Sequence, residues 1–407
     1  MIANPMNPHA APDRLHALDA LRAIALLLGL VVHASMAFLP GAEYFWFAHD
    51  AEPSVGVSLA FYVPHMFRML LFFLIAGFFG RLSLERLGVR AFAWNRFRRI
   101  TLVLVVFWPI VLTGIIAAAV VASSISGSST LPEPPPPAFT PSDFPLTHLW
   151  FLYVLTLCYI VALAFRWALC RLDRSGRITR LTDRLVPVLA GPAGPALLAL
   201  PLAAALALTP GWMQWFGVPT PDNSLYPNLA ACVAFGSAFA FGWALHRNSP
   251  TMHRWVRNWP CHLAVAVTAT GACLWIGGLE PSMPRVSLGP WIIPYAALYA
   301  LGGWSWTVSL LGIALRYLAS ANRAVRYVAD GSYWVYLVHL PLVILFQAYA
   351  VQLPLPGSLK FVLVVATVFF VSLGSYALLV RRSWVGAFLN GKRRGKKLES
   401  AGALEAA

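Results

Sequence analysis

The sequence predicts an all-α integral membrane protein, built as a bundle of about ten transmembrane helices. Of its 407 residues, 59% are hydrophobic and only 11% are charged, and the mean hydropathy is +0.69. Soluble domains usually carry about 25% charged residues, so a soluble fold is excluded. Apolar segments recur at the length of roughly 20 residues that a helix needs to cross a bilayer. Lys and Arg residues gather in alternate connections between these segments.

Each predicted span is an apolar run bounded by charged, polar or Pro-rich residues. No cleavable signal peptide is evident, because the first apolar run is already long enough to span. The run over 186–209 is interrupted by Gly191, Pro192 and Gly194, which favours a short or broken helix. The connection 123–147 is rich in Ser, Gly and Pro, which predicts a flexible or extended loop. The spans are expected at residues 18–39, 58–80, 100–122, 148–169, 186–209, 228–246, 259–279, 290–312, 331–350 and 358–380.

The basic residues predict how the chain is oriented. The net charge is +15, and all but four of the 30 Lys and Arg residues lie on one set of connections and on the C-terminal tail. The exceptions are Arg285 and Lys360 on the other set, and Arg22 and Arg68 within spans. This is the positive-inside pattern, which predicts a multi-pass membrane protein with both termini cytoplasmic. The pattern argues against nucleic-acid binding, and attraction to anionic lipid is a secondary effect.

We expect a single transmembrane domain over residues 18–380. A cytoplasmic segment, 1–17, precedes it, and a basic tail, 381–407, follows it and is expected to be disordered. The sequence contains no P-loop, no Gly-rich dinucleotide motif and no metal-ligand spacing. An NTP-driven pump and a zinc enzyme therefore lack their usual motifs, and no metal site is predicted.

Two ionisable residues share one face of the first predicted helix. Arg22 and His33 are eleven residues apart, about three turns, so they point the same way and lie about 16 Å apart along the axis. Asp19 is three residues before Arg22 and can pair with it. The pair could simply anchor the helix at the membrane surface. Ionisable groups within a membrane usually face a bundle interior or a cavity and mark function, so His33 is the strongest candidate.

A second pair lies in the next predicted span. His65 and Arg68 are three residues apart on one face. Entered from the periplasm at about residue 58, the helix places Arg68 about 15 Å deep, near the bilayer midplane. A cation at that depth needs an anionic or carbonyl partner, and the candidates are Asp19, backbone carbonyls of another helix or a bound substrate. A purely structural ion pair is the alternative interpretation.

The remaining candidates are more ambiguous. The arginine cluster just before the third span has guanidinium groups suited to phosphates, but ordinary positive-inside signalling accounts for it equally well. The His and aromatic residues of the fourth and ninth spans fit either a site or an aromatic belt and helix packing, and a loop carboxylate is usually solvated. Several His within one bundle could support a proton relay or general-base catalysis. These candidates are Arg96, Arg98 and Arg99; His148 and Trp150; Tyr336 and His339; and Glu52.

These residues also carry a family resemblance. The chain resembles the acyltransferase-3 group, ten-span membrane enzymes that modify extracytoplasmic glycans, and within it the branch linked to succinylation of osmoregulated periplasmic glucans. The spacing Arg22-x10-His33 and the Arg96-x-x-Arg99 pair match motifs of that group. Ile75 and Ala76 depart from the usual small-hydroxyl pattern, which affects packing. The matching segments, between residues 18 and 341, are LDALRAIALLLGLVVH, AEPS, HMFRMLLFFLIAGFF, RFRRI, HLWFL and SYWVYLVHLPL.

The resemblance implies a multi-pass protein of the bacterial inner membrane, and also a donor, an acceptor and a role for each candidate. The donor would be cytoplasmic acyl-CoA, with succinyl-CoA expected and acetyl-CoA as the alternative, and the acceptor a periplasmic glucan hydroxyl. His33 would act as general base or accept the acyl group itself, with Asp19 orienting Arg22. The phosphates would dock on Arg96 and Arg99, helped by Arg98. Arg68 and His65 would bind the succinyl carboxylate or the oxyanion. The acceptor side would be shaped by Glu52, His148, Trp150, Tyr336 and His339.

The same residues are compatible with two alternative functions. An acetyltransferase acting on another cell-envelope glycan would use them in the same way. A proton-coupled transporter or flippase would use the buried Arg and His as an anion path, although the internal symmetry usual for such proteins is not visible. The expected partners are the lipid bilayer, acyl-CoA and the glucan, with no nucleic acid; the oligomeric state stays open, and a homo-oligomer is compatible with the sequence.

Overall fold

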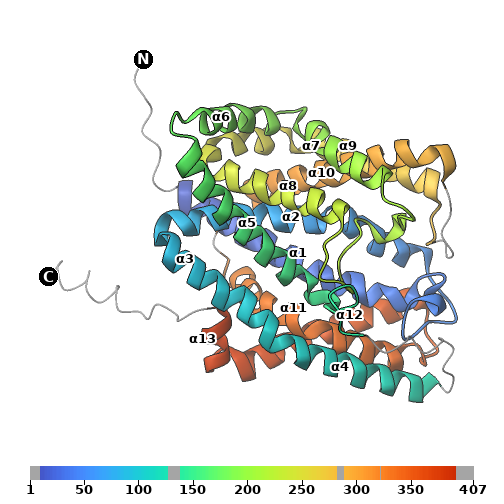
Figure 1. Ribbon diagram of the computed structural model, residues 1–407. Coiled ribbons are helices and arrows are strands. Elements are labelled where there is room, and N and C mark those ends of the chain that lie inside the picture. Colours follow the sequence, from blue (N-terminus) through green and yellow to red (C-terminus); the bar gives the residue numbers. More distant parts are fainter. Residues whose placement is uncertain (1–9, 127–137, 282–287, 321, 391–407) are drawn as a thin grey trace.

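The computed structural model describes residues 10–126, 138–281, 288–320 and 322–390, and these residues form helices and connecting turns without a strand. Figure 1 shows most of the long helices running side by side along one axis. The fold class expected from the sequence is therefore confirmed. The helices are α1 (Ala10–Ser35), α2 (Val55–Leu87), α3 (Val89–Arg96), α4 (Leu102–Ser126), α5 (Trp150–Leu172), α6 (Arg177–Leu189), α7 (Gly194–Ala207), α8 (Leu229–Leu245), α9 (His253–Gly277), α10 (Ile292–Tyr317), α11 (Arg323–Ala350), α12 (Gly357–Ser375) and α13 (Trp384–Asn390).

The number of spans agrees with the sequence once one long segment is divided. In the described residues, eight helices are long and apolar enough to cross a membrane, or nine if one bent pair counts as a span. One of the eight, Leu229–Gly277, contains α8 and α9 and loses helical geometry at Asn248. Its 49 residues would measure about 74 Å as one helix, more than twice the hydrocarbon thickness. Since α8 packs on α2 and α9 on α10, we count them separately, which gives about ten spans in this part of the chain.

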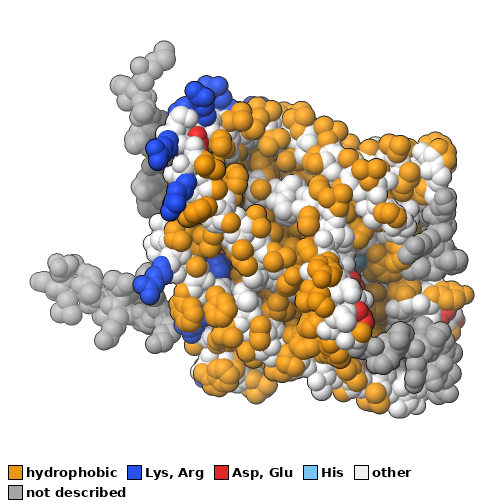
Figure 2. Space-filling view, viewed as in Figure 1, with side chains coloured by type: hydrophobic (Ala, Val, Ile, Leu, Met, Phe, Trp, Pro, Cys, Tyr) orange, Lys and Arg blue, Asp and Glu red, His pale blue; other side chains and the backbone are white. Residues whose placement is uncertain are grey.

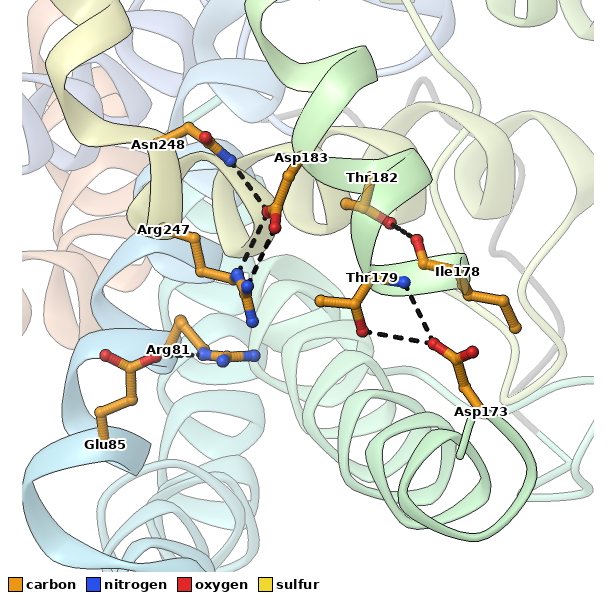
Figure 3. A network of polar contacts seen from close by, with 9 residues as sticks. All are labelled: Arg81, Glu85, Asp173, Ile178, Thr179, Thr182, Asp183, Arg247 and Asn248. Atoms are coloured by element: carbon orange, nitrogen blue, oxygen red, sulfur yellow. Dashed lines mark hydrogen bonds and ion pairs between the residues drawn. The ribbon is translucent and has the colours of Figure 1, made fainter. Parts of the chain in front are cut away.

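The weakest predicted span is a broken one. Helices α6 and α7 meet at an angle of 105° across Gly191 and Pro192, where the sequence predicts the interruption. Figure 3 shows α6 fastened to the turn after α8: the Asp183 carboxylate accepts hydrogen bonds from Arg247 at 2.9 and 3.2 Å and from Asn248 at 3.2 Å. These contacts tie the amphipathic α6 to the bundle.

Charge is distributed unevenly along the bundle. Figure 2 shows the Lys and Arg side chains of the visible face gathered at one end, while its middle is mostly hydrophobic. We call this the basic end; α3, α6 and α13 lie there, and α1 begins there (Figure 1). The described part of the chain also ends there, with α13. The distribution is the one expected for a protein whose positive residues stay on one side of a membrane.

The C-terminal region is more ordered than expected at its start. Disorder was expected from residue 381, but α13 (Trp384–Asn390) packs against α11 and against the π-helical turn Phe97–Thr101. The reason is that its apolar side chains Val385, Phe388 and Leu389 join the hydrophobic core. The rest of the tail, residues 391–407, lies outside the described residues. So do residues 127–137 of the Pro-rich connection and the first nine residues of the segment 1–17.

Helix α1 occupies the centre of the bundle. It contacts α2 and α10 on one side and α11 and α12 on the other. In Figure 1 it runs between these two groups of helices. The part of α1 that carries His33 therefore faces neighbouring helices. Asp19 and Arg22, nearer the start of the helix, have side chains that are 44% and 38% exposed.

Candidate functional site

A narrow cavity in the bundle interior collects six of the thirteen candidate residues. It has a volume of about 40 Å³, space for water-sized groups. Residues of α1, α2, α5 and α11, and of the short turn before α5, form its walls. The lining residues are Ala25, Leu26, Gly29, His33, Arg68, Met69, Phe72, His148, Trp150, Phe151, Tyr336 and His339. The sequence analysis singled out six of these twelve as site residues.

Three imidazole rings meet in this cavity. The His33 ring centroid is 5.3 Å from that of His339 and 6.4 Å from that of His148, and the His148 and His339 centroids are 5.0 Å apart. The three residues are far apart in the sequence and come from different elements. In the described part of the chain, no group of three or more His, Cys, Asp or Glu side chains is arranged to hold a metal ion. Imidazole groups this close together can accept and pass on protons.

Tyr336 fixes two of the three rings. Its backbone carbonyl accepts hydrogen bonds from His148 Nε2 at 3.1 Å and from His339 Nδ1 at 2.7 Å, and its hydroxyl donates to the His148 carbonyl at 2.9 Å. A carbonyl only accepts, so these two ring nitrogens carry the protons. The other nitrogens, His148 Nδ1 and His339 Nε2, are buried without a hydrogen-bond partner among the described residues, as is His33 Nδ1. When the rings are neutral, His148 Nδ1 and His339 Nε2 therefore each carry a lone pair that can accept a proton.

Arg68 is a cation without a carboxylate partner among the described residues. Its Nη1 lies against α1 at Gly29, where an added Cβ would be only 2.8 Å away. Gly29 is one helical turn before His33, so the guanidinium lies beside the histidine cluster. No described carboxylate is within 4.0 Å of Arg68, and its Nε is buried without a partner in this part of the structure. Asp19, a candidate partner from the sequence, pairs instead with Arg22 at 3.2 Å.

His65 and Glu52 are among the predicted site residues that do not line the cavity. His65 Nδ1 bonds to the Phe61 carbonyl at 2.7 Å, and the His65 ring lies 4.3 Å from the Phe61 ring. Its one-turn spacing from Arg68 is as predicted, but it is absent from the cavity lining. Glu52 is exposed on the loop after α1 and is likewise absent from the lining.

The structure adds two residues that the sequence analysis missed. Gln347, fully buried in α11, donates from Nε2 to the carbonyls of His33 and Ala34, at 3.0 and 2.9 Å. Its Oε1 accepts a hydrogen bond from Trp46 Nε1 at 2.7 Å. The Trp46 ring is nearly parallel to the His33 ring, at 6.3 Å and 17°. The one sequence signal for Gln347 is an amide side chain within an apolar span, which must find partners when buried.

The arginine cluster lies at the basic end, where α3 passes into the π-helical turn before α4. Arg96 stacks over the rings of Phe92 and Tyr159, each with its guanidinium carbon 5.5 Å from the ring centroid. The carbonyl of Arg99 accepts a hydrogen bond from the Tyr333 hydroxyl at 2.8 Å. The Tyr333 ring in turn stacks on Tyr336, with centroids 6.3 Å apart.

The arginine cluster is thus connected to the histidine cluster through two tyrosines one turn apart on α11. Arg98 is exposed to the surroundings at the same end. Arg22 and Asp19 line a separate, larger pocket near the start of α1. The bundle therefore has arginines at its basic end, then Tyr333 and Tyr336. Beyond them lie the three histidines of the cavity, beside the guanidinium of Arg68. Such an arrangement can bind an anionic ligand, accept a proton from a hydroxyl and stabilise negative charge on a reacting oxygen.

Comparisons with known proteins agree with this chemistry. A family model described as an acyltransferase domain matches residues 15–380. "Glucans biosynthesis protein C" of Escherichia coli O139:H28 (strain E24377A / ETEC) is 24% identical over 352 residues, covering 84% of this chain and 86% of that protein. The protein of the same name from Shigella boydii serotype 4 (strain Sb227) is 32% identical over 106 residues, 26% of each chain. No solved structure matches the chain. Because the family model covers most of its length, the chain belongs to the acyltransferase-3 family of membrane acyltransferases.

Proposed function

We propose that this protein transfers an acyl group, preferentially succinyl, from cytoplasmic acyl-CoA to a hydroxyl group of a periplasmic glucan. The observation that carries the proposal is the cavity that His33, His148, His339 and Arg68 share. There, imidazole nitrogens without a hydrogen-bond partner among the described residues lie beside the Arg68 guanidinium. The family supplies the reaction class, and the name of the relatives supports a glucan as acceptor.

Orientation follows from charge. The basic end is assigned to the cytoplasm by the positive-inside rule. His33 lies eleven residues along α1 from Arg22, about 16 Å further into the membrane. The acyl-CoA head group would stay near the basic end, with its phosphates held by Arg96 and Arg99 and Arg98 close by. The extended pantetheine arm would carry the thioester past Tyr333 and Tyr336 to the histidine cluster.

The chemistry at the cluster is an ordinary acyl transfer. His33 takes the proton of the glucan hydroxyl while the hydroxyl oxygen attacks the thioester carbonyl carbon. The tetrahedral intermediate then expels the CoA thiolate, which receives the proton from the imidazolium. His148 and His339, held by Tyr336, line the acceptor side together with Trp150. His65 supports Arg68 from the preceding turn of α2, and Asp19 orients Arg22. A His33-bound acyl group is the alternative first step.

The donor assignment depends on Arg68. A guanidinium with no carboxylate partner at this depth suits an acyl group that brings its own carboxylate. Succinyl-CoA meets this requirement, whereas acetyl-CoA would leave the cation uncompensated. Because Arg68 is beside Gly29, one turn from His33, a short dicarboxylate could reach both groups.

A reconstituted transfer assay tests the proposal. Protein in lipid nanodiscs would be given succinyl-CoA or acetyl-CoA and a β-glucan, and the mass of the glucan would be followed. We expect a succinyl mass increment that is lost in His33→Ala and kept in His262→Ala, a control for a buried histidine on α9 outside the cavity. If no acyl group is transferred while the same protein in liposomes carries solute across, the protein is a transporter and the proposal is wrong.

A further inference from the structure

A second pocket at the basic end has the size and charge of a binding site for a phosphorylated head group. It lies between residues 16–22 of α1 and the first turns of α11 with the residues just before them, and its volume is about 450 Å³. The cavity at the histidine cluster, about 40 Å³, is more than ten times smaller. A nucleotide-sized group therefore fits the larger pocket, and the narrow cavity admits only a thin chain.

Three guanidinium groups line this pocket, from Arg22, Arg323 and Arg326. The acidic groups facing it are Asp19 and Asp330, and the imidazole of His16 faces it too. Asp19 is already paired with Arg22 at 3.2 Å, and Asp330 has an interaction of its own. Arg323 and Arg326 have no described carboxylate within 4.0 Å. Because they are three residues apart on α11, both can reach one ligand.

The start of α11 adds donors and a favourable dipole. Asn322 caps the helix: its side-chain oxygen accepts from the backbone N–H of Ala324 at 2.8 Å and of Val325 at 3.4 Å. The Asn322 amide and the Ser320 hydroxyl also line the pocket. The positive end of a 28-residue helix favours an anion near its first turn. The two arginines nevertheless supply the main attraction, since a guanidinium binds phosphate oxygens with paired hydrogen bonds.

This pocket is adjacent to the arginine cluster but does not include it. None of Arg96, Arg98 and Arg99 lines the pocket. Arg22 connects the two regions: its guanidinium lies 5.8 Å from the Phe79 ring and within electrostatic range of Tyr159, the ring over which Arg96 stacks. The basic end therefore holds two separate groups of arginines, one lining the pocket and one outside it, with Arg22 near both.

Acyl-CoA carries phosphate in two separate places, a diphosphate on the pantetheine side and a phosphomonoester on the 3′ position of the ribose. We propose that Arg323 and Arg326 bind the 3′-phosphomonoester of the donor, while Arg96 and Arg99 hold its diphosphate. The inference rests on the proposed function, since it names a subsite for the same donor. It makes these two arginines determinants of donor affinity, without a part in the chemistry at His33.

The test compares donors with and without the 3′-phosphate. Protein in nanodiscs of phosphatidylcholine would be titrated with succinyl-CoA and with succinyl-dephospho-CoA, and KM and kcat would be measured for both. We expect wild-type protein to favour the 3′-phosphorylated donor by about tenfold or more in KM, with similar kcat. In Arg323→Gln/Arg326→Gln the two KM values should become nearly equal, because only the phosphorylated donor is weakened. Arg323→Lys/Arg326→Lys should keep part of the preference.

A charge-matched control and a lipid arm complete the experiment. Arg177→Gln/Arg180→Gln removes two exposed arginines from α6 at the same end and should keep the wild-type preference. Equal KM values for both donors in the wild type would overturn the inference and leave the proposed function standing. Transfer from neither donor would overturn the proposed function itself. If short-chain phosphatidate bound in an Arg323- and Arg326-dependent way and the donors were not distinguished, the pocket would be a lipid head-group site, and the inference would be wrong.

Discussion

The side-chain amide of Gln347 holds the backbone of His33, with Nε2 donating to the His33 carbonyl at 3.0 Å across 314 residues of sequence. The same nitrogen donates to the Ala34 carbonyl, and both carbonyls belong to the last residues of α1. The last carbonyls of a helix lack N–H partners within that helix, so Gln347 supplies a donor that the helix cannot. Trp46, which bonds to Gln347 Oε1, extends this support to the face of the His33 ring.

Replacing Gln347 should impair catalysis more than donor binding. In Gln347→Leu the two carbonyls lose their donor and Trp46 loses its acceptor, so the His33 ring is less well placed. A small misplacement of a reacting group can reduce turnover about 10²-fold, and we expect kcat to fall on that order while KM for the donor changes little. The measurement is steady-state transfer in nanodiscs. Gln352→Leu, an exposed glutamine just beyond α11, is the matched control.

Gln347→Glu distinguishes a donor role from simple packing. An ionised carboxylate has nearly the same shape but cannot donate to the carbonyls of His33 and Ala34. We expect this variant to lose activity about as severely as Gln347→Leu. Full activity in the Glu variant would show that the amide donors are not needed to position His33.

Adding one methyl group at Gly29 should displace Arg68 without unfolding the protein. The new Cβ would lie 2.8 Å from Arg68 Nη1, the movable end of a long side chain. In Gly29→Ala we therefore expect turnover with succinyl-CoA to fall by about tenfold or more. The thermal unfolding temperature should stay the same or rise, because alanine favours a helix over glycine. Gly236→Ala in α8, where the added atom meets nothing within 4 Å, should leave transfer unchanged.

Removing the Arg68 cation should affect the two donors differently. If Arg68 binds the second carboxylate of succinyl, Arg68→Met should reduce kcat/KM for succinyl-CoA about tenfold more than for acetyl-CoA. Parallel kinetics with both donors measure this ratio, and Arg68→Lys should recover part of the succinyl preference. An equal loss of about 10²–10³ with both donors would instead assign Arg68 to the oxyanion and remove the physical basis for a succinyl preference.

The sequence predicted the polar residues that line the cavity better than the residues that hold them in place. His33, Arg68, His148 and His339 stand out because ionisable groups in apolar helices need a shared interior, and the helical period fixes the face of each. Nothing local shows that Gln347 meets the end of α1, since that contact depends on how α1 and α11 pack. Glu52 and His65 do not line the cavity, and their roles stay predictions.

The same limit applies to Lys360, which the sequence analysis counted with Arg285 as the two basic residues on the other set of connections. In the structure its Nζ lies 2.7 Å from Asp50 Oδ2, and the two side chains are 6% and 0% exposed. Asp50 Oδ1 also accepts a hydrogen bond from the Glu52 backbone N–H, and the Asp50 N–H donates to Ala37. This ion pair therefore closes the loop after α1 against the start of α12.

Breaking the pair should destabilise this loop strongly. Asp50→Asn or Lys360→Met leaves one buried charge without its partner, which costs about 3–5 kcal/mol in known cases. We expect a lower unfolding temperature for either variant, measured by differential scanning fluorimetry of the purified protein in detergent. The double variant Asp50→Leu/Lys360→Met removes both charges and should recover much of the loss, because an apolar pair avoids the desolvation penalty. If the double variant were as unstable as the sum of the single ones, the hydrogen bond from Glu52 to Asp50, and not the ion pair, would be the main stabilising contact.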